Sequence, residues 1–244
     1  NIYNVINNDT KNSNTYYIQE YIKYYFGTNI NKNISIESHI ICKFRLILYN
    51  CGWLQKDSIN IVSKANIIDF YKFLICDTFN YSLNIIKISK TDNKTTNLDF
   101  DMITITNYHD DTKDNKVSLS SMVDKWVDKN FGDNNYKFEN IPFFIPIYID
   151  MTDPYTKLNK KYINIMEGLN FKNICDNLQK TIIWEINSII CQTSTGYYYT
   201  IINYDMTWVG FSDNNIPSNW TVDMSDIQTV KKIMQEVKMI FYKL

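Results

Sequence analysis

Glycine, proline and arginine are all scarce in this sequence. Six Gly and four Pro among 244 residues are too few for long flexible linkers or for a glycine loop that cradles a phosphate. Arg45 is the only arginine, and 25 basic side chains are balanced by 26 acidic ones. Because nucleic-acid-binding proteins usually carry a basic face, this balance excludes a nucleic-acid partner. No apolar run reaches membrane-spanning length and no signal peptide is recognisable, so we expect no membrane association.

Cysteine pairs are also missing. The five cysteines stand singly, at Cys42, Cys51, Cys76, Cys175 and Cys191. Without a C-x-x-C pair we expect no zinc site and no cofactor. An odd, unclustered set is typical of a reducing compartment, which predicts a cytoplasmic or nuclear protein. The excess of Asn, Ile, Lys and Tyr, whose codons are AT-rich, indicates an AT-rich genome, such as that of an intracellular parasite or a large DNA virus.

The chain is nevertheless rich enough in apolar residues, at 45%, to build a core, and its first half shows helical periodicity. Helices are predicted at 16–26, 40–54, 65–79 and 120–131. In the third, Ile67, Tyr71 and Leu74 lie at i, i+4 and i+7, on one face.

Short strands are predicted within 83–107, and strand texture dominates from residue 141 onward. The strand candidates are β-branched and aromatic runs at 141–150, 182–191, 197–204, 208–211 and 237–242. A short helix at 225–235 interrupts them. Helices first and strands afterwards predict an α+β fold with segregated layers.

Considered alone, the residues offer few ways to build a nucleophilic site. His39 and His109 are the only histidines. His39 precedes Cys42 by three residues, so the two can touch on a helix. A neighbour on the same helix is a poor general base, because the imidazole must aim at the thiol and be oriented by a third group. A buried cysteine beside a surface histidine is the favoured interpretation. His109, followed by Asp110 and Asp111, is typical of a solvated loop.

A longer pattern lies near the C-terminus, in STGYYYTIINYDMTWVGFSDNNI (194–216) and KMIFYKL (238–244). It resembles the end of the ubiquitin-specific protease domain, where S-G-H-Y-Y-(T/A)-Y is followed by W-x-x-F-(D/N)-D and a closing A-Y-x-L-F-Y strand. The matching residues are Gly196, Tyr198, Tyr199, Thr200, Trp208, Phe211, Asp213, Phe241 and Tyr242.

Upstream segments are similar to the same family. These segments are 13–26 (the nucleophile box), 64–75, 140–150, 159–174 and 181–192. The resemblance implies one domain over 1–244 with a papain-like cysteine protease fold. Its expected parts are an N-terminal helical lobe (1–80), a reduced fingers or linking region (81–140) without the usual C-x-x-C pairs, and a C-terminal antiparallel β lobe (141–244).

The resemblance also implies that the catalytic triad has been lost. The family's nucleophilic Cys falls on Tyr16, its general-base His on Tyr197, and its orienting Asp or Asn on Ser212. The oxyanion-hole Asn falls near Lys11 or Asn12. A phenol, with a pKa of ~10, neither attacks like a thiolate nor shuttles protons near neutral pH as an imidazole does. Because triad members act as a unit, the resemblance implies a pseudoenzyme.

Two functional hypotheses follow. The first is a catalytically inactive module that binds a protein partner, either ubiquitin, a ubiquitin-like protein or a larger assembly. Groove candidates are Tyr198, Tyr199, Trp208, Phe211 and Asp213, although such tyrosines are also ordinary core and sheet residues. The second is an active deubiquitinase or cysteine peptidase whose nucleophile has moved to Cys42 or Cys51.

Overall fold

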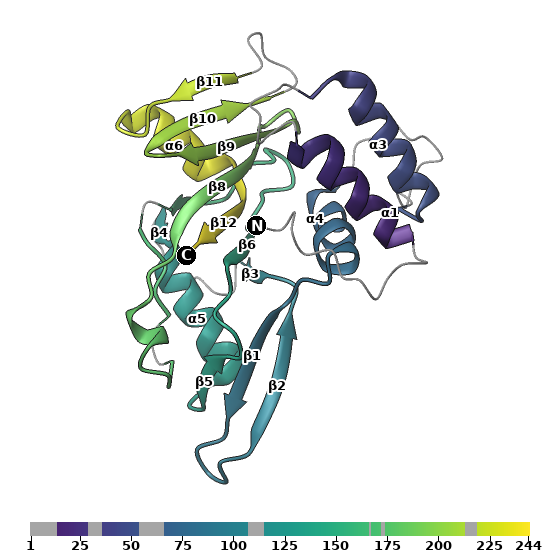
Figure 1. Cartoon of the computed structure of the whole chain (residues 1–244). Helices are drawn as coiled ribbons and strands as arrows, with labels where there is room; N and C mark the ends of the chain where they lie inside the picture. The colour runs from purple at the N-terminus through teal and green to yellow at the C-terminus, as the bar shows by residue number, and fades with distance from the viewer. Residues whose placement is uncertain are drawn as a thin grey trace. The chain divides into compact units, whose positions relative to one another are not determined.

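The computed structural model describes residues 14–28, 36–53, 66–106, 115–165, 167–171, 174–212 and 219–244. The chain divides into two compact units, residues 1–82 and 83–244, and each is described by itself. Figure 1 shows helices in the first unit and sheets in the second, which confirms the predicted α+β class. The finer division at residues 80 and 140 stays a prediction.

The N-terminal unit is built of helices. They are α1 (Asn14–Tyr21), the π-helix η3 (Ile22–Gly27), α3 (Ser38–Asn50), α4 (Ile67–Tyr71) and the π-helix η4 (Lys72–Thr78). The first three helices predicted from periodicity are therefore confirmed, except that two of them widen into π-helices. The buried core of this unit includes Ile18, Tyr21, Phe44 and Leu48. The rings of Tyr21 and Phe44 stack with their centroids 5.8 Å apart.

The C-terminal unit contains a seven-stranded sheet in the order β11-β10-β9-β8-β12-β6-β3. Its strands are β3 (Ile103–Thr106), β6 (Phe144–Asp150), β8 (Glu185–Gln192), β9 (Tyr198–Tyr204), β10 (Thr207–Phe211), β11 (Asn219–Val222) and β12 (Val237–Lys243). Neighbouring strands are antiparallel except β3, which runs parallel to β6. The strands of this sheet that come from 141–244 are antiparallel to their neighbours, as predicted, and β3, which comes from the linking region, adds a parallel edge.

Smaller elements complete this unit. They are β1 (Leu83–Ile88), β2 (Thr95–Phe100), β5 (Asn135–Phe138), the pair β4 (Lys116–Ser118) and β7 (Tyr162–Asn164), α5 (Leu119–Phe131), the 3-10 turn η6 (Gln179–Thr181) and α6 (Ile227–Glu236). A separate three-stranded sheet has the order β2-β1-β5. On α5 the residues predicted to face inward, Val123, Trp126 and Val127, are all buried.

The side chain of Gln179 links the turn η6 to β5 by two hydrogen bonds. Its side chain is buried, its Oε1 accepts a hydrogen bond from the Phe138 N–H at 3.0 Å, and its Nε2 donates to the Phe138 carbonyl at 3.0 Å. Phe138 packs edge-on against Phe171 and Trp184. One amide side chain thus satisfies both backbone groups of a core residue that has no strand partner on that side.

Candidate functional site

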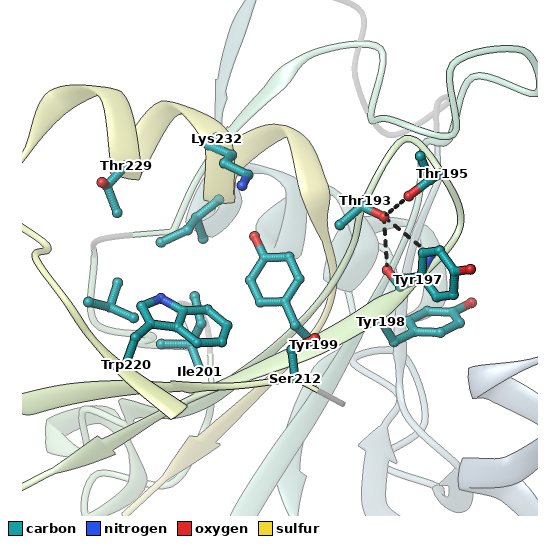
Figure 2. Close-up of a pocket in the computed structure, with 12 residues that line it drawn as sticks. Thr193, Thr195, Tyr197, Tyr198, Tyr199, Ile201, Ser212, Trp220, Thr229 and Lys232 are labelled. Carbon is teal, nitrogen blue, oxygen red and sulfur yellow. Dashed lines mark hydrogen bonds between the residues drawn. The ribbon is translucent and has the colours of Figure 1, made fainter. Parts of the chain in front are cut away.

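A pocket of about 350 Å³ opens between α6 and the β9–β11 end of the large sheet. Figure 2 shows α6 above the pocket, β11 on one side and the turn between β8 and β9 on the other. The residues that line it are Thr193, Thr195, Tyr197, Tyr198, Tyr199, Ile201, Ser212, Trp220, Val222, Thr229, Lys232 and Ile233. All of them belong to the C-terminal unit.

The β8–β9 turn is held by Thr193. Its N–H donates to the Tyr197 carbonyl at 2.9 Å, and its hydroxyl oxygen accepts from the Tyr197 N–H at 3.2 Å. Gly196 adopts φ +85°, a conformation that strains residues with a Cβ, and its N–H donates to the Thr193 carbonyl. This geometry fixes the backbone of Tyr197 at the pocket rim, where its side chain is 46% exposed.

Tyr199 points from β9 into the interior. Its hydroxyl donates to Oε2 of Glu236 at 2.5 Å. Cys191 is the cross-strand partner of Tyr199 and is fully buried. Burial raises the pKa of the Cys191 thiol to about 12 and raises the pKa of the Tyr199 phenol as well. Both groups therefore keep their protons at neutral pH, and Cys191 cannot supply a thiolate there.

Trp220 forms one wall of the pocket by lying over a glycine. A Cβ on Gly210 would overlap the Trp220 indole, so this close approach requires glycine. Trp220 and Tyr199 have ring centroids 6.0 Å apart. The position of Trp220 thus depends on cross-strand pairing, because Gly210 and Trp220 are direct partners on β10 and β11.

Helix α6 supplies the upper wall. Its first turn is capped by Asp226, whose Oδ2 accepts from the N–H of Thr229 at 2.8 Å and from the Thr229 hydroxyl at 2.7 Å. Lys232 lies one turn further on, and its side chain reaches from the helix toward the hydroxyl of Tyr199 (Figure 2). The pocket therefore has a cationic group at its upper wall.

Four residues singled out by the resemblance come together at this pocket. Tyr197 and Ser212, the positions of the family's His and Asp, both line it, as do Tyr198 and Tyr199. Tyr16, the position of the nucleophile, is half-buried on α1 in the N-terminal unit. The five tyrosine and serine positions are thus divided between the two units.

Other predicted residues fall elsewhere. Trp208 and Phe211 lie half-buried on β10 and are not among the lining residues. Asp213 lies outside the described residues, as do Lys11, Asn12 and His109 with its neighbouring acids.

Lys232, Trp220 and Glu236 were not predicted from the sequence. Lys232 and Trp220 look like ordinary surface residues in the sequence, and only the fold places them at the pocket. Glu236 and Lys238 did carry a signal, because they flank a single valine at the start of an otherwise apolar strand. Both are buried, and Lys238 donates to the Thr152 hydroxyl and to Oδ1 of Asn159. Burial lowers the pKa of Lys238 to about 8.

The alternative nucleophiles lie on the helical unit. His39 Nδ1 is 3.0 Å from Oε2 of Glu37, and both side chains are mostly exposed. Cys42 is exposed on α3, which contradicts the expectation that it is buried, and no hydrogen bond joins it to His39. Burial raises the pKa of Cys51. The geometry gives His39 a carboxylate neighbour in place of a thiol.

Two absences hold for the described residues alone. Within these ranges no cluster of three or more His, Cys, Asp or Glu side chains is arranged to hold a metal ion. None of the described helices is both long and apolar enough to cross a membrane.

Comparison with known proteins shows a likeness of fold. No protein-family profile and no curated protein sequence matches the chain. Among solved structures it is similar to a chain of the Ubp8-Sgf11-Sgf73-Sus1 SAGA DUB module, with a TM-score of 0.53 and 13% identity over 94% of this chain. It is also similar to the Saccharomyces cerevisiae Pan2 pseudoubiquitin hydrolase-RNA exonuclease module, with a TM-score of 0.51 and 13% identity over 93% of this chain.

The protein spans only part of these structures, 57% of the first chain and 46% of the second. One of the two comes from a DUB module and the other from a pseudo-hydrolase module, so the likeness covers both kinds of module. At 13% identity it establishes architecture alone. Over most of its length, the chain has the fold of ubiquitin-specific-protease-type modules.

Proposed function

We propose that this chain is a catalytically inactive module of the ubiquitin-specific-protease type that binds a protein partner. The observation that carries the proposal is that Tyr197 and Ser212 line one pocket of the C-terminal unit. In the family pattern these positions hold the general base and the group that orients it. A phenol and a hydroxyl at these places cannot take a proton from a nucleophile near neutral pH.

The proposed architecture is papain-like, with the helical unit as one lobe and the large sheet as the other. The three-stranded sheet β2-β1-β5 lies within the segment predicted to hold the fingers. We assign it as a reduced form of the fingers without a zinc site. A smaller fingers region offers less contact area to the globular part of ubiquitin. We therefore expect weak binding, with most contacts made by the surfaces of this protein outside the fingers.

Titration with ubiquitin tests the proposal. We expect saturable binding at micromolar concentrations, observed as chemical-shift changes in labelled ubiquitin. A ubiquitin lacking its C-terminal residues serves as a control for contacts made by the tail. Absence of binding at high micromolar concentration would reject ubiquitin as the partner. The proposed role would then be that of a structural component in a larger assembly, or a binder of a ubiquitin-like protein.

A restored triad tests the assignment of positions. The triple variant Tyr16→Cys, Tyr197→His and Ser212→Asp replaces each degenerate residue with the family's own type. We expect this variant to form a covalent adduct with ubiquitin that carries a C-terminal electrophile. The matched control keeps Tyr197→His and Ser212→Asp but leaves Tyr16 unchanged. If the triple variant is folded, binds ubiquitin and forms no adduct, the three positions do not form one site.

The second candidate function is a peptidase with a displaced nucleophile. Because Cys42 is exposed and Cys51 is only partly so, Cys42 is the favoured nucleophile for this function. The same electrophilic ubiquitin distinguishes it from the first. An adduct on the unmodified chain that disappears in Cys42→Ser, but not in Cys51→Ser, would establish an active enzyme. We expect no adduct, because His39, the histidine that the structure describes, lies against Glu37 and makes no hydrogen bond to the Cys42 thiol.

A further inference from the structure

The pocket between α6 and β9–β11 presents one cation and no acid among its lining residues. Lys232 is the only charged side chain in that set. Within the ranges that the structure describes, the Lys232 ammonium has neither an ion pair nor a hydrogen bond. Figure 2 shows its amine directed toward the space beside the Tyr199 ring, not along the outside of the helix. An unpaired ammonium so directed can complete its interactions with an incoming anion.

The neighbouring polar groups favour an acceptor as the ligand. No described residue accepts a hydrogen bond from the Trp220 indole N–H, which faces the same space in Figure 2. The Tyr199 hydroxyl proton is already committed to Glu236, and the Thr229 hydroxyl donates to Asp226. On the α6 and β11 sides of the pocket, Lys232 and Trp220 therefore supply donors, both of which suit an oxygen acceptor.

The rest of the lining is apolar. Ile201, Val222 and Ile233 are buried beneath the polar rim, and the face of Trp220 adds an aromatic wall. Small-molecule pockets typically have a volume of roughly 300–1,000 Å³ and combine an apolar lining with a few polar groups. At about 350 Å³ this pocket accommodates something the size of one amino-acid residue.

We propose that this pocket binds a carboxylate monoanion carried on an apolar or aromatic body. One ammonium balances one negative charge, whereas a phosphate group carries nearly two charges and generally requires more donors. The Glu236 carboxylate, placed behind the Tyr199 hydroxyl, also disfavours a dianion at this position. Such a ligand comes either from the C-terminal residue of a peptide or from a free small acid. The inference goes beyond the proposed function, because it requires neither ubiquitin nor the N-terminal unit.

Matched acids and amides test the charge requirement. The probes are N-acetylphenylalanine and its amide, and a hexapeptide ending in Phe with a free or an amidated terminus. Binding is measured by calorimetry and by the quenching of tryptophan fluorescence. We expect each acid to bind at least about tenfold more tightly than its amide. Equal affinity of the two acids identifies a small free acid as the ligand type, and a tighter hexapeptide identifies a peptide terminus.

Variants of α6 test the assigned residue. Lys232→Gln should weaken binding of the acids about tenfold and leave the amides unchanged. Lys231→Gln is the matched control, because Lys231 is the adjacent exposed lysine on the same helix and does not line the pocket. Binding of the acids should weaken with salt in the original chain but not in Lys232→Gln.

Three results with the acids and amides would overturn the proposal. They are equal affinity for acid and amide, acid binding unaffected by Lys232→Gln, and no binding of either acid at millimolar concentration. Tighter binding of a phosphorylated hexapeptide than of the free-acid peptide would also overturn it, in favour of a phosphate site. None of these results depends on ubiquitin, so failure of this proposal and failure of the proposed function are separately visible.

Discussion

The Tyr199 hydroxyl donates a 2.5 Å hydrogen bond to Oε2 of Glu236, and both residues are buried. Tyr199→Phe removes the donor and leaves a buried carboxylate without it. Because an unsatisfied buried group costs about 1–3 kcal/mol, and more when charged, we expect a loss of that size in the free energy of unfolding. Urea denaturation measures it. Tyr204→Phe, an exposed position on the same strand, should change stability by less than about 0.5 kcal/mol.

Lys238 makes the free energy of unfolding rise with pH. Its pKa is lowered by burial to about 8 in the folded chain, from 10.5, although Asp150 acts in the opposite direction. Between these values the unfolded state binds more protons, so the free energy of unfolding rises as pH rises. Comparison of the original chain with Lys238→Met from pH 7 to 10.5 isolates this contribution. A constant difference between the two across that range would contradict it.

Cys191 makes the free energy of unfolding fall as pH rises, which is the opposite of the effect of Lys238. Burial raises the pKa of its thiol from 9.0 to about 12, so the folded state holds the proton longer than the unfolded state. The resulting stability is fully present below pH 9 and is lost as pH rises toward 12. Cys191→Ala should therefore reduce the steepness of the alkaline loss. Thermal unfolding at a series of pH values checks the slope, while the value at neutral pH reports the packing of the sulfur atom that the variant also removes.

Gly210→Ala should disturb the pocket wall. The added methyl would overlap the Trp220 ring, and overpacking of this kind costs about 1–3 kcal/mol. We also expect a shift in tryptophan emission, because Trp220 must move from its place over β10. Thr207→Ala, at an exposed position on the same strand, is the control. Unchanged stability and emission in Gly210→Ala would mean that Trp220 does not lie over this glycine.

Gln179→Ala tests the link to β5. It leaves both the N–H and the carbonyl of buried Phe138 without the partners described above. At about 1–3 kcal/mol for each unsatisfied group, the loss should reach about 2 kcal/mol or more. Gln228→Ala, an exposed glutamine on α6, should be nearly neutral. A small effect at Gln179 would indicate that water replaces the amide.

The sequence was most informative where burial and periodicity coincide. Residues 119–131 form the predicted helix with Val123, Trp126 and Val127 buried, because one apolar face faces the core. Strands of three or four residues, such as β5 and β7, escaped prediction because distant partners hold them in place. The π-helical turns also escaped, since the same residues suit an ordinary α-helix.

The site was predictable only in part. Tyr197 and Ser212 were found through the resemblance, and no periodicity would have selected them. Lys232 was missed because an exposed lysine on an amphipathic helix normally faces solvent. Its place in the pocket depends on α6 lying opposite β9 and β11, a relationship that arises only when the sheet has formed.

The central place of β12 has a consequence for the nascent chain. Residues 237–243 lie between β8 and β6, which are synthesised earlier. On the ribosome both strands leave the exit tunnel before their common neighbour does, so each presents an open backbone edge during that interval. Pairing between such distant segments is slow, and open edges recruit other chains. The newly made protein therefore stays exposed to aggregation until residues 237–243 have emerged and paired with both strands.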